Sequence, residues 1–355
     1  MTQIGPHDPQ VFSEARTLRK HDKIARANWC IVVADNHGSA RATDGSHAPI
    51  PEQYCRLGKG LTPLQRTIHR AARIAPASQI LITALAEHRP HWEPWIWFVR
   101  PERRFVTDHR SASLLSSAAA ILSVAASSAS HVITILPGRC YVAHEEILQF
   151  ALSRAISALP GISEGIITLG MHDIEEGVDE DYLVARRARA GAGLQVDGFA
   201  RWPVPWVARH LKRYGALVAS GIMIGYAGAF ASHIVRHWPG LSVQLTHLAA
   251  TAVAAGKECR ISSSLTRDVS SVVLHSLRWQ PPACRQRVFG VCRSGWSGLK
   301  SPRSFARAVR FSSLELPMLI ASSAPPRTGR TEGASMASRS QEFQASPLAT
   351  ESVDD

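Results

Sequence analysis

Apolar runs alternate with amphipathic stretches along most of this chain. Residues 29–34 (WCIVVA) are apolar and rich in β-branched side chains, which is typical of a buried strand. Residues 62–74 (TPLQRTIHRAARI) place apolar side chains at helical spacing, and Thr62 followed by Pro63 predicts the start of a helix. The folded part is therefore predicted to begin with a strand, a loop and a helix.

The same alternation continues further along the chain. Strands are predicted at 78–87 (SQILITALAE), 91–100 (HWEPWIWFVR), 131–138 (HVITILPG) and 164–171 (EGIITLGM), and helices at 111–129 and 143–159. Strands that alternate with helices indicate βαβ units, hence an α/β fold with a mostly parallel sheet flanked by helices. Ligands of such sheets bind at the carboxyl ends of strands. The segments expected at the site are 34–41, 100–104, 138–141 and 199–203.

One uncharged segment, residues 214–232 (YGALVASGIMIGYAGAFAS), is long enough to be compared with a membrane span, and its Gly221-x-x-x-Gly225 matches a helix-pairing motif. Its many glycine, alanine and serine residues favour a buried strand (ASGIMIGY) followed by the start of a helix. Residues 1–25 read as a polar arm. Residues 321–355 have no apolar period and are expected to be disordered. The predicted domain spans 26–320.

Composition agrees with a largely globular chain. Of its 355 residues, 45% are hydrophobic and 19% charged, enough to bury a substantial core. Forty lysine and arginine residues against 28 aspartate and glutamate residues give a net charge of +12, which favours anionic partners. The positive charges are scattered, so they predict a basic surface, with no specific nucleic acid and no membrane as partner.

The cysteines and paired acids are predicted to be structural. The six cysteines form no C-x-x-C pair and several lie in apolar contexts, so we expect buried thiols in a reducing compartment and no zinc site. The first residues contain no apolar signal segment, and a cytoplasmic location is expected. Glu145 and Glu146 are adjacent, so they are predicted to be solvated residues of a first helical turn.

Five segments, in this order, resemble sugar nucleotidyltransferases, and among these the mannose-1-phosphate guanylyltransferases. WCIVVADNHGSAR corresponds to W-A-x-V-L-A-G-G-x-G-T-R-L, and PEQYCRLGKGLTPLQRTIHRAARI to P-K-Q-Y/F followed by L-L-Q-x-T-x-x-R-A. ILPGRCYVAHEEILQFAL corresponds to V-L-P-S/A-D-H-x-V, VDGFARWP…GALVASGIM to V-x-x-F-V-E-K-P and G-x-L-W-N-S-G, and SGWSGLK to G-W-S/N-D-L/V-G. Their shared order and approximate spacing over residues 28–312 make the resemblance specific.

The resemblance implies a Rossmann-like nucleotidyltransferase domain. It also implies attack of a sugar 1-phosphate oxygen on the α-phosphorus of GTP, releasing pyrophosphate, with Mg²⁺ held by carboxylates. GTP or a nucleotide sugar is the implied partner. The matching nucleotide-binding positions are Asp35, Gly38, Ser39, Arg41 and Gln53, and those on the sugar-phosphate side are Gly215 and Ser220.

The sequence differs from the family at positions that the resemblance implies bind phosphate, sugar or metal. It keeps the residues at positions implied to support the fold. Kept framework residues are Trp29, Pro51, Gln53, Leu57, Leu136, Pro137, Phe199, Pro203, Gly215 and Trp296. The substituted positions are Glu52 for a phosphate-binding lysine, Arg139 and Gly298 for two metal-binding aspartates, and Arg201 and Trp202 for a glutamate and a lysine. In PERRFVTDH, Arg103 and Phe105 replace an asparagine and a glycine.

These losses predict impaired catalysis, with at most binding of a nucleotide or nucleotide sugar. No residue is predicted to be catalytic and no metal ligand is assigned. One alternative is an active guanylyltransferase that uses Mg²⁺ in a rebuilt site, with Asp35 as replacement ligand. Others are a basic non-enzymatic binding protein and a chain without a specific ligand.

Overall fold

The computed structural model describes residues 28–35, 50–57, 60–109, 113–162, 165–172, 180–187, 193–262, 264–267, 286–301 and 303–312. The predicted arm and tail lie outside these residues. The strands are β1 (Asn28–Val33), β2 (Ile80–Leu85), β3 (Arg104–Thr107), β4 (Val132–Pro137), β5 (Ile166–Met171), β6 (Tyr182–Arg187), β7 (Leu194–Ala200), β8 (Leu217–Tyr226), β9 (Cys259–Ile261) and β10 (Gln286–Val291).

The strands form one mixed sheet in the order β5-β10-β7-β6-β8-β4-β1-β2-β3-β9. In one half, β4, β1, β2, β3 and β9 are parallel. The other half turns back on itself, because β8 pairs antiparallel with β4, β5 and β6. Since β5 also pairs with β10, β10 with β7 and β7 with β6, five strands close into a ring.

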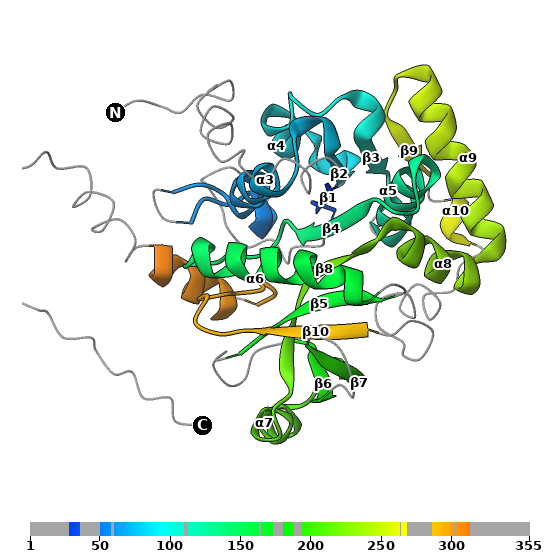
Figure 1. The fold of residues 1–355 in the computed structure, drawn as a ribbon. Coiled ribbons are helices and arrows are strands. Elements are labelled where there is room, and N and C mark those ends of the chain that lie inside the picture. Colours follow the sequence, from blue (N-terminus) through cyan, green and yellow to red (C-terminus); the bar gives the residue numbers. More distant parts are fainter. Residues whose placement is uncertain are drawn as a thin grey trace, which may run out of the picture. The chain divides into compact units, whose positions relative to one another are not determined.

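Helices cover both faces of the parallel half (Figure 1). The helices of the described part are α3 (Pro63–Ile74), α4 (Arg89–Trp92), α5 (Ser113–Ser127), α6 (Glu145–Ala158), α7 (Pro205–Arg213), α8 (Ala227–His237), α9 (Pro239–Ala255) and α10 (Ser264–Arg267), with a last helix at 303–312. Of these, α7 lies beside β6 and β7 and not on the parallel half. One buried core lies under α3, α4 and α6, and a second under α5, α8 and α9. The two cores arise because alternate residues of β1, such as Cys30 and Ile31, point to opposite faces.

The predicted α/β fold is confirmed, and so are most of its elements. α3 begins as its sequence indicates: the Thr62 Oγ1 accepts from the Gln65 N–H at 3.2 Å, and the Thr62 N–H donates to Gln65 Oε1 at 2.7 Å. This reciprocal capping box satisfies two backbone N–H groups that a helix start leaves open. β1, β2, β4, β5, α5 and α6 lie where apolar periodicity places them.

The strand predicted at 91–100 is wrong. This segment forms the end of α4 and a 3₁₀ turn, Glu93–Trp95, and the next strand begins only at Arg104. Pro90 and Pro94 explain the difference, because proline fixes the helical φ at a first turn and cannot donate a ladder hydrogen bond. Trp92 is fully buried, and its Nε1–H donates to the Leu85 carbonyl at 2.8 Å.

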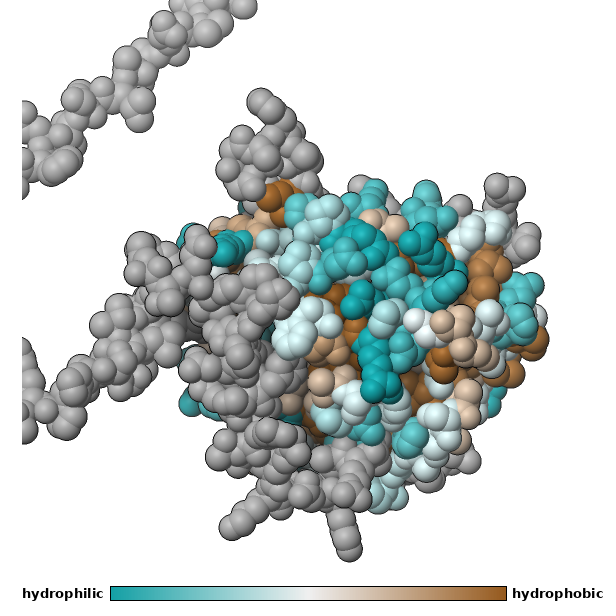
Figure 2. All heavy atoms as spheres, turned by 90° about the horizontal axis from the view of Figure 1, so that it is seen from above, coloured by the Kyte–Doolittle hydropathy of each residue, from teal (hydrophilic) through white to brown (hydrophobic). Residues whose placement is uncertain are grey.

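The uncharged segment is a strand followed by a helix, as predicted: β8 ends at Tyr226 and α8 starts at Ala227. Within the described part of the chain, the structure has no helix of the length and apolarity needed to cross a membrane. Figure 2 shows one face as a mosaic of hydrophilic and hydrophobic side chains. Its larger hydrophobic areas lie on the right, the side on which α9 appears in Figure 1.

The cysteines differ in their accessibility to reagents. Cys30, Cys140 and Cys259 are buried, while Cys292 is exposed. Burial raises the pKa of Cys30 and Cys140, and raises that of Cys259 to about 11, so these thiols are protonated at neutral pH. Cys284 lies outside the described residues, so the test uses a Cys284→Ser background. We expect Ellman's reagent at pH 8 to modify Cys292 rapidly, and the buried thiols, Cys55 among them, only after unfolding. A Cys292→Ser control that still reacts rapidly in the native state would contradict this burial.

Candidate functional site

The carboxyl ends of β1 and β4 are held together by their backbones. The Gly138 N–H donates to the Val33 carbonyl at 2.7 Å, and a Cβ at position 138 would lie 2.8 Å from that same oxygen. Only glycine allows this approach. The Ala34 N–H donates to the Thr83 carbonyl of β2 at 2.8 Å. Three strand ends therefore converge at one edge of the sheet, where ligands of parallel sheets bind.

A short 3₁₀ turn, Glu52–Tyr54, lies against this edge. The Ala34 carbonyl accepts hydrogen bonds from Gln53 Nε2 at 3.4 Å and from the Tyr54 hydroxyl at 3.0 Å. Gln53 and Glu52 are both buried. Gln53 therefore supports the end of β1, and Glu52 places a carboxyl group where the resemblance implies a lysine.

Asp35 is buried beside the start of α5. The Ser116 hydroxyl of this helix donates a short hydrogen bond to Asp35 Oδ2. The N-terminal end of a helix favours a negative charge, so this position suits an aspartate. The Asp35 side chain is thus engaged in a structural hydrogen bond. The resemblance implies two adjacent glycines at this point, which would have no side chain and a more flexible backbone. Gly38, Ser39 and Arg41 lie outside the described residues, and their predicted contact with a nucleotide stays a prediction.

The segment after β4 rests on a buried ion pair. Arg70 of α3 donates from Nε to Glu145 Oε2 at 3.0 Å and from Nη2 to Oε1 at 2.6 Å. The arginine side chain is 1% exposed and Glu145 25%. Arg70 Nη1 also lies 3.6 Å from the Cys140 sulfur. The prediction of a solvated Glu145 is therefore wrong, because its carboxylate pairs with a buried arginine; Glu146, at 75% exposure, fits that prediction.

The segment containing Gly298 packs against the same edge. Its neighbour Ser297 exchanges backbone hydrogen bonds of 2.8 and 2.9 Å with Tyr141. A Cβ at position 298 would collide with Oε1 of the fully buried Glu180. A carboxylate from another part of the chain therefore occupies the space where the resemblance implies an aspartate side chain.

The cation paired with that carboxylate is a lysine. Lys300 Nζ lies 2.7 Å from Glu180 Oε2 and 3.5 Å from Asp181 Oδ2, and the lysine side chain is 28% exposed. Burial raises the pKa of Glu180, and Lys300 opposes this shift. Lys300 therefore offsets carboxylate charge at the sheet edge without any bound ion.

The two implied metal positions do not fit Mg²⁺. Arg139 is a cation, Gly298 has no side chain, and the nearby Glu180 already pairs with Lys300. Across the described ranges, no group of three or more histidine, cysteine, aspartate and glutamate side chains is arranged to hold a metal ion. Mg²⁺ prefers several oxygen ligands in octahedral geometry, which this donor set does not offer.

Ser220 and Gly221 bend β8 beside the site. The Ser220 hydroxyl donates to the Leu169 carbonyl at 2.6 Å and accepts from the Ile222 N–H at 3.0 Å. Gly221 has a φ of +78° and lies against Pro137 at the end of β4. Ser220 is therefore engaged with the backbone of β5, and its predicted role on the sugar-phosphate side stays a prediction.

Arg201, Trp202 and Gly215 lie around α7. The Arg201 guanidinium stacks over the Trp202 ring at 4.6 Å, and Trp202 is 60% exposed with a φ of +41°. Gly215 has a φ of +82° where the chain passes from α7 to β8. Ala200 pairs with Tyr182, which pairs with Val218 near the end of β5, so segment 199–203 reaches the predicted edge.

Segment 100–104 is the exception among the predicted site segments. Arg103 stacks over Trp29 at 4.9 Å, and Trp29 lies at the amino end of β1. Arg103 is therefore at the opposite edge, because the chain enters β3 there and does not leave it. The residues that follow β3, Asp108 and His109, occupy the carboxyl edge, which the wrong strand prediction concealed.

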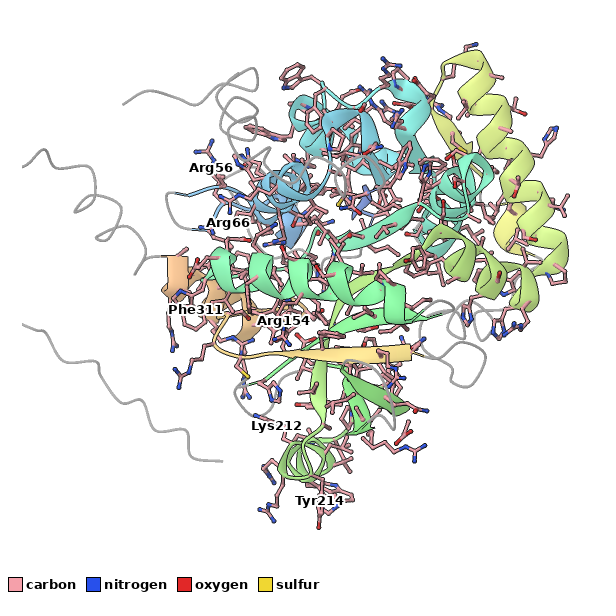
Figure 3. The ribbon with its side chains drawn as sticks, viewed as in Figure 1. Arg56, Arg66, Arg154, Lys212, Tyr214 and Phe311 are labelled. Carbon is pink, nitrogen blue, oxygen red and sulfur yellow. The ribbon has the colours of Figure 1, made fainter. Side chains whose placement is uncertain are left out.

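Further cationic side chains border the site. Arg66 of α3 stacks over the ring of Tyr141 at 4.8 Å, and the Phe311 ring stacks on the same tyrosine, with ring centroids 6.4 Å apart. Figure 3 shows Arg56 and Arg66 on the same side of the domain as Phe311. With Arg139, these arginines give the edge a positive character that suits phosphates.

Comparison with known proteins establishes the fold. No protein-family model and no curated protein matches the sequence significantly. A solved structure described as mannose-1-phosphate geranyltransferase from Thermus thermophilus is similar, with a TM-score of 0.61, 20% identity and 79% of each chain covered. A structure described as mannose-6-phosphate isomerase from Helicobacter pylori has a TM-score of 0.55 and 14% identity, covering 76% of this chain and 99% of its own.

The Asp35–Ser116 hydrogen bond should stabilise the fold. We expect Ser116→Ala to lower the free energy of unfolding by about 1–3 kcal/mol, because it leaves a buried carboxylate without this donor. Urea unfolding followed by circular dichroism measures the difference. Ser157→Ala, at an exposed position of α6, is the matched control and should change little. Equal stability of both variants would contradict the proposed role of this bond.

Position 298 and Glu180 should be energetically coupled. We expect Gly298→Ala to destabilise the protein by about 1–3 kcal/mol, because the new methyl group enters space held by Glu180. In a Glu180→Ala background, the same change should cost less. A double-mutant cycle from denaturant titrations measures this coupling. Additive effects of the two substitutions would show that the two positions do not compete for space.

Proposed function

We propose that this chain is a nucleotidyltransferase-like protein that binds a nucleotide or nucleotide sugar at the carboxyl edge of its sheet, and that it lacks metal-dependent nucleotidyl transfer. The observation that supports this most directly is the Glu180–Lys300 pair beside Gly298. In the family it resembles, this position would present a carboxylate to Mg²⁺. Here a protein cation pairs with the nearby carboxylate, so this position recruits no ion, and the positive charge of the site comes from its arginines.

The fold and the resemblance favour the same ligand class. The two similar structures both have names that refer to mannose phosphates, and the sequence segments resemble guanylyltransferases. A nucleoside diphosphate sugar with guanine and mannose is therefore the first ligand to test. Arg66, Arg139 and Lys300 could approach its phosphates as fixed cations, and an arginine guanidinium can bind two phosphate oxygens at once.

Loss of chemistry follows from electrostatics. Transfer of a nucleotidyl group requires stabilisation of the charge that develops on the α-phosphate and on the leaving pyrophosphate. Glu52 adds a buried negative charge near the end of β1 and removes the implied lysine. At about 4 Å and an effective dielectric constant near 20, one pair of unit charges interacts by roughly 4 kcal/mol. Repulsion between the Glu52 carboxylate and the phosphates opposes nucleotidyl transfer. It has less effect on binding of the sugar or the base, which lie further from Glu52.

The binding experiment is a calorimetric titration of GDP-mannose and GTP, with EDTA and then with Mg²⁺. We expect the same dissociation constant in both conditions. Lys300→Met combined with Glu180→Gln should weaken binding about tenfold, because one charge-assisted contact to a phosphate is lost while the fully buried Glu180 is not left as an unpaired charge. Lys257→Met is the matched control, since it removes an exposed lysine next to β9 at the opposite edge.

Pyrophosphate release with GTP, mannose 1-phosphate and Mg²⁺ is measured on the same sample, beside an active family member. No release together with metal-independent binding supports the proposal. Release above background would establish the alternative of an active guanylyltransferase with a rebuilt site. Failure to bind any nucleotide, in a folded sample, would favour a basic non-enzymatic binding protein.

A further inference from the structure

A second basic surface surrounds α7, and it shares only Arg201 and Trp202 with the segments predicted to lie at the site edge. We call it the α7 surface, and it consists of Arg201, Trp202, Trp206, Arg209, Arg213 and Tyr214, all exposed. The three aromatic side chains are 60%, 67% and 74% exposed, in chain order. Large aromatic side chains at this exposure on a soluble domain indicate an interaction surface when they occur together.

The inner side of α7 is already packed. Ala208 is buried, and Leu211 is half-buried against the hydrophobic core. The exposed aromatic residues are therefore additional to those that the helix needs for its own packing. Figure 3 shows Tyr214 on the outer side of α7 and Lys212 on the side toward the domain. The His210 and Tyr214 rings lie 4.5 Å apart, which holds Tyr214 against the helix end.

The α7 surface is positively charged, and no acidic residue lies close to it in the sequence. No aspartate or glutamate occurs between Asp197 and Glu258. Asp197, on the adjacent strand β7, pairs with Arg186 at 2.9 Å. Arg201 lies over Trp202, so one cation is held directly on an exposed aromatic face. A partner of this surface must therefore be anionic and must also accept aromatic side chains.

The scattered charges of the sequence predict no membrane partner, but the exposed aromatic residues of α7 lead us to infer that the α7 surface binds the anionic surface of a membrane. Tryptophan and tyrosine have an apolar body and a polar group, and they concentrate at membrane–water interfaces. Arginine residues beside them are attracted to acidic lipid headgroups. Figure 1 shows α7 projecting beyond β6 and β7, so the outer side of this helix can meet a flat surface. A single nucleic-acid strand is favoured by a groove that follows its backbone, and a projecting helix is the opposite shape.

This inference does not depend on the proposed nucleotide site, because Trp206, Arg209, Arg213 and Tyr214 lie outside every segment predicted for that site, and Arg66, Arg139 and Lys300 are not part of the α7 surface. The helix is short, and its apolar side packs on the domain, so the expected binding is peripheral and reversible. Electrostatic attraction to headgroups is screened by salt, and the binding should weaken as ionic strength rises. Insertion of Trp202 and Trp206 should shift tryptophan fluorescence to shorter wavelength.

The experiment is co-sedimentation of the full chain with phosphatidylcholine vesicles that do or do not contain phosphatidylserine. We expect binding to the phosphatidylserine vesicles and little binding to phosphatidylcholine alone. Trp202→Ser with Trp206→Ser should reduce binding about tenfold, and Arg209→Gln with Arg213→Gln should do the same. Circular dichroism and the thermal midpoint verify that these surface variants are folded.

Two variants serve as matched controls. Trp97→Ser removes another tryptophan that is 48% exposed, and Lys257→Gln with Arg260→Gln removes two exposed cations at the amino-terminal edge. Both should bind vesicles as the unmodified chain does. The inference is overturned if the α7 variants bind equally well, which would assign binding to another part of the chain, or if no vesicles are bound. Binding of a single-stranded oligonucleotide is measured separately. If the oligonucleotide binds tightly through the α7 residues and vesicles are not bound, the α7 surface is a nucleic-acid surface instead.

Discussion

The architecture depends on one bent strand. β8 is hydrogen-bonded to β4, β5 and β6, so it joins the parallel half of the sheet to the ring of five strands. The bend occurs at Gly221, whose φ of +78° is unfavourable for a residue with a Cβ. Ser220 fixes the bend by accepting from Ile222 and donating to Leu169. The same turn brings Gly221 against Pro137, where the candidate site begins.

Charges in the site are arranged to neutralise one another within the protein. Glu145 pairs with Arg70 and Glu180 pairs with Lys300, whereas Asp35 accepts a hydrogen bond from the uncharged Ser116 hydroxyl. A removed partner in such a buried pair leaves a charge whose desolvation is costly. A site built in this way has cationic partners for Glu145 and Glu180 without a bound metal ion. It differs from a metal-dependent site, whose carboxylates repel one another until an ion binds.

Sequence patterns predicted the elements better than the contacts. The strands at β1, β2 and β4 followed from short apolar runs, and α3 from Thr62 and Pro63, because local propensity and burial agree there. HWEPWIWFVR misled the prediction, since its tryptophans favour a strand while Pro90 and Pro94 impose helical turns. The contact between Glu180 and Gly298 could not be predicted from the sequence, because the two positions meet only when the segment after β10 packs on Tyr141. The burial of Glu145 depended likewise on Arg70, which a single helical pattern does not reveal.

Closure of the five-strand ring also affects whether the sheet can pair with the sheet of another copy of the chain. An open sheet has two edges whose unpaired backbone groups can join another chain and start aggregation. Here β5, at one end of the strand order, pairs back onto β8. Among the described strands, the other end of the order is β9, which has three residues and an Arg260 side chain that is 78% exposed. A short, charged edge is a poor template for strand addition, so the geometry that bends β8 also protects the sheet from edge-to-edge association.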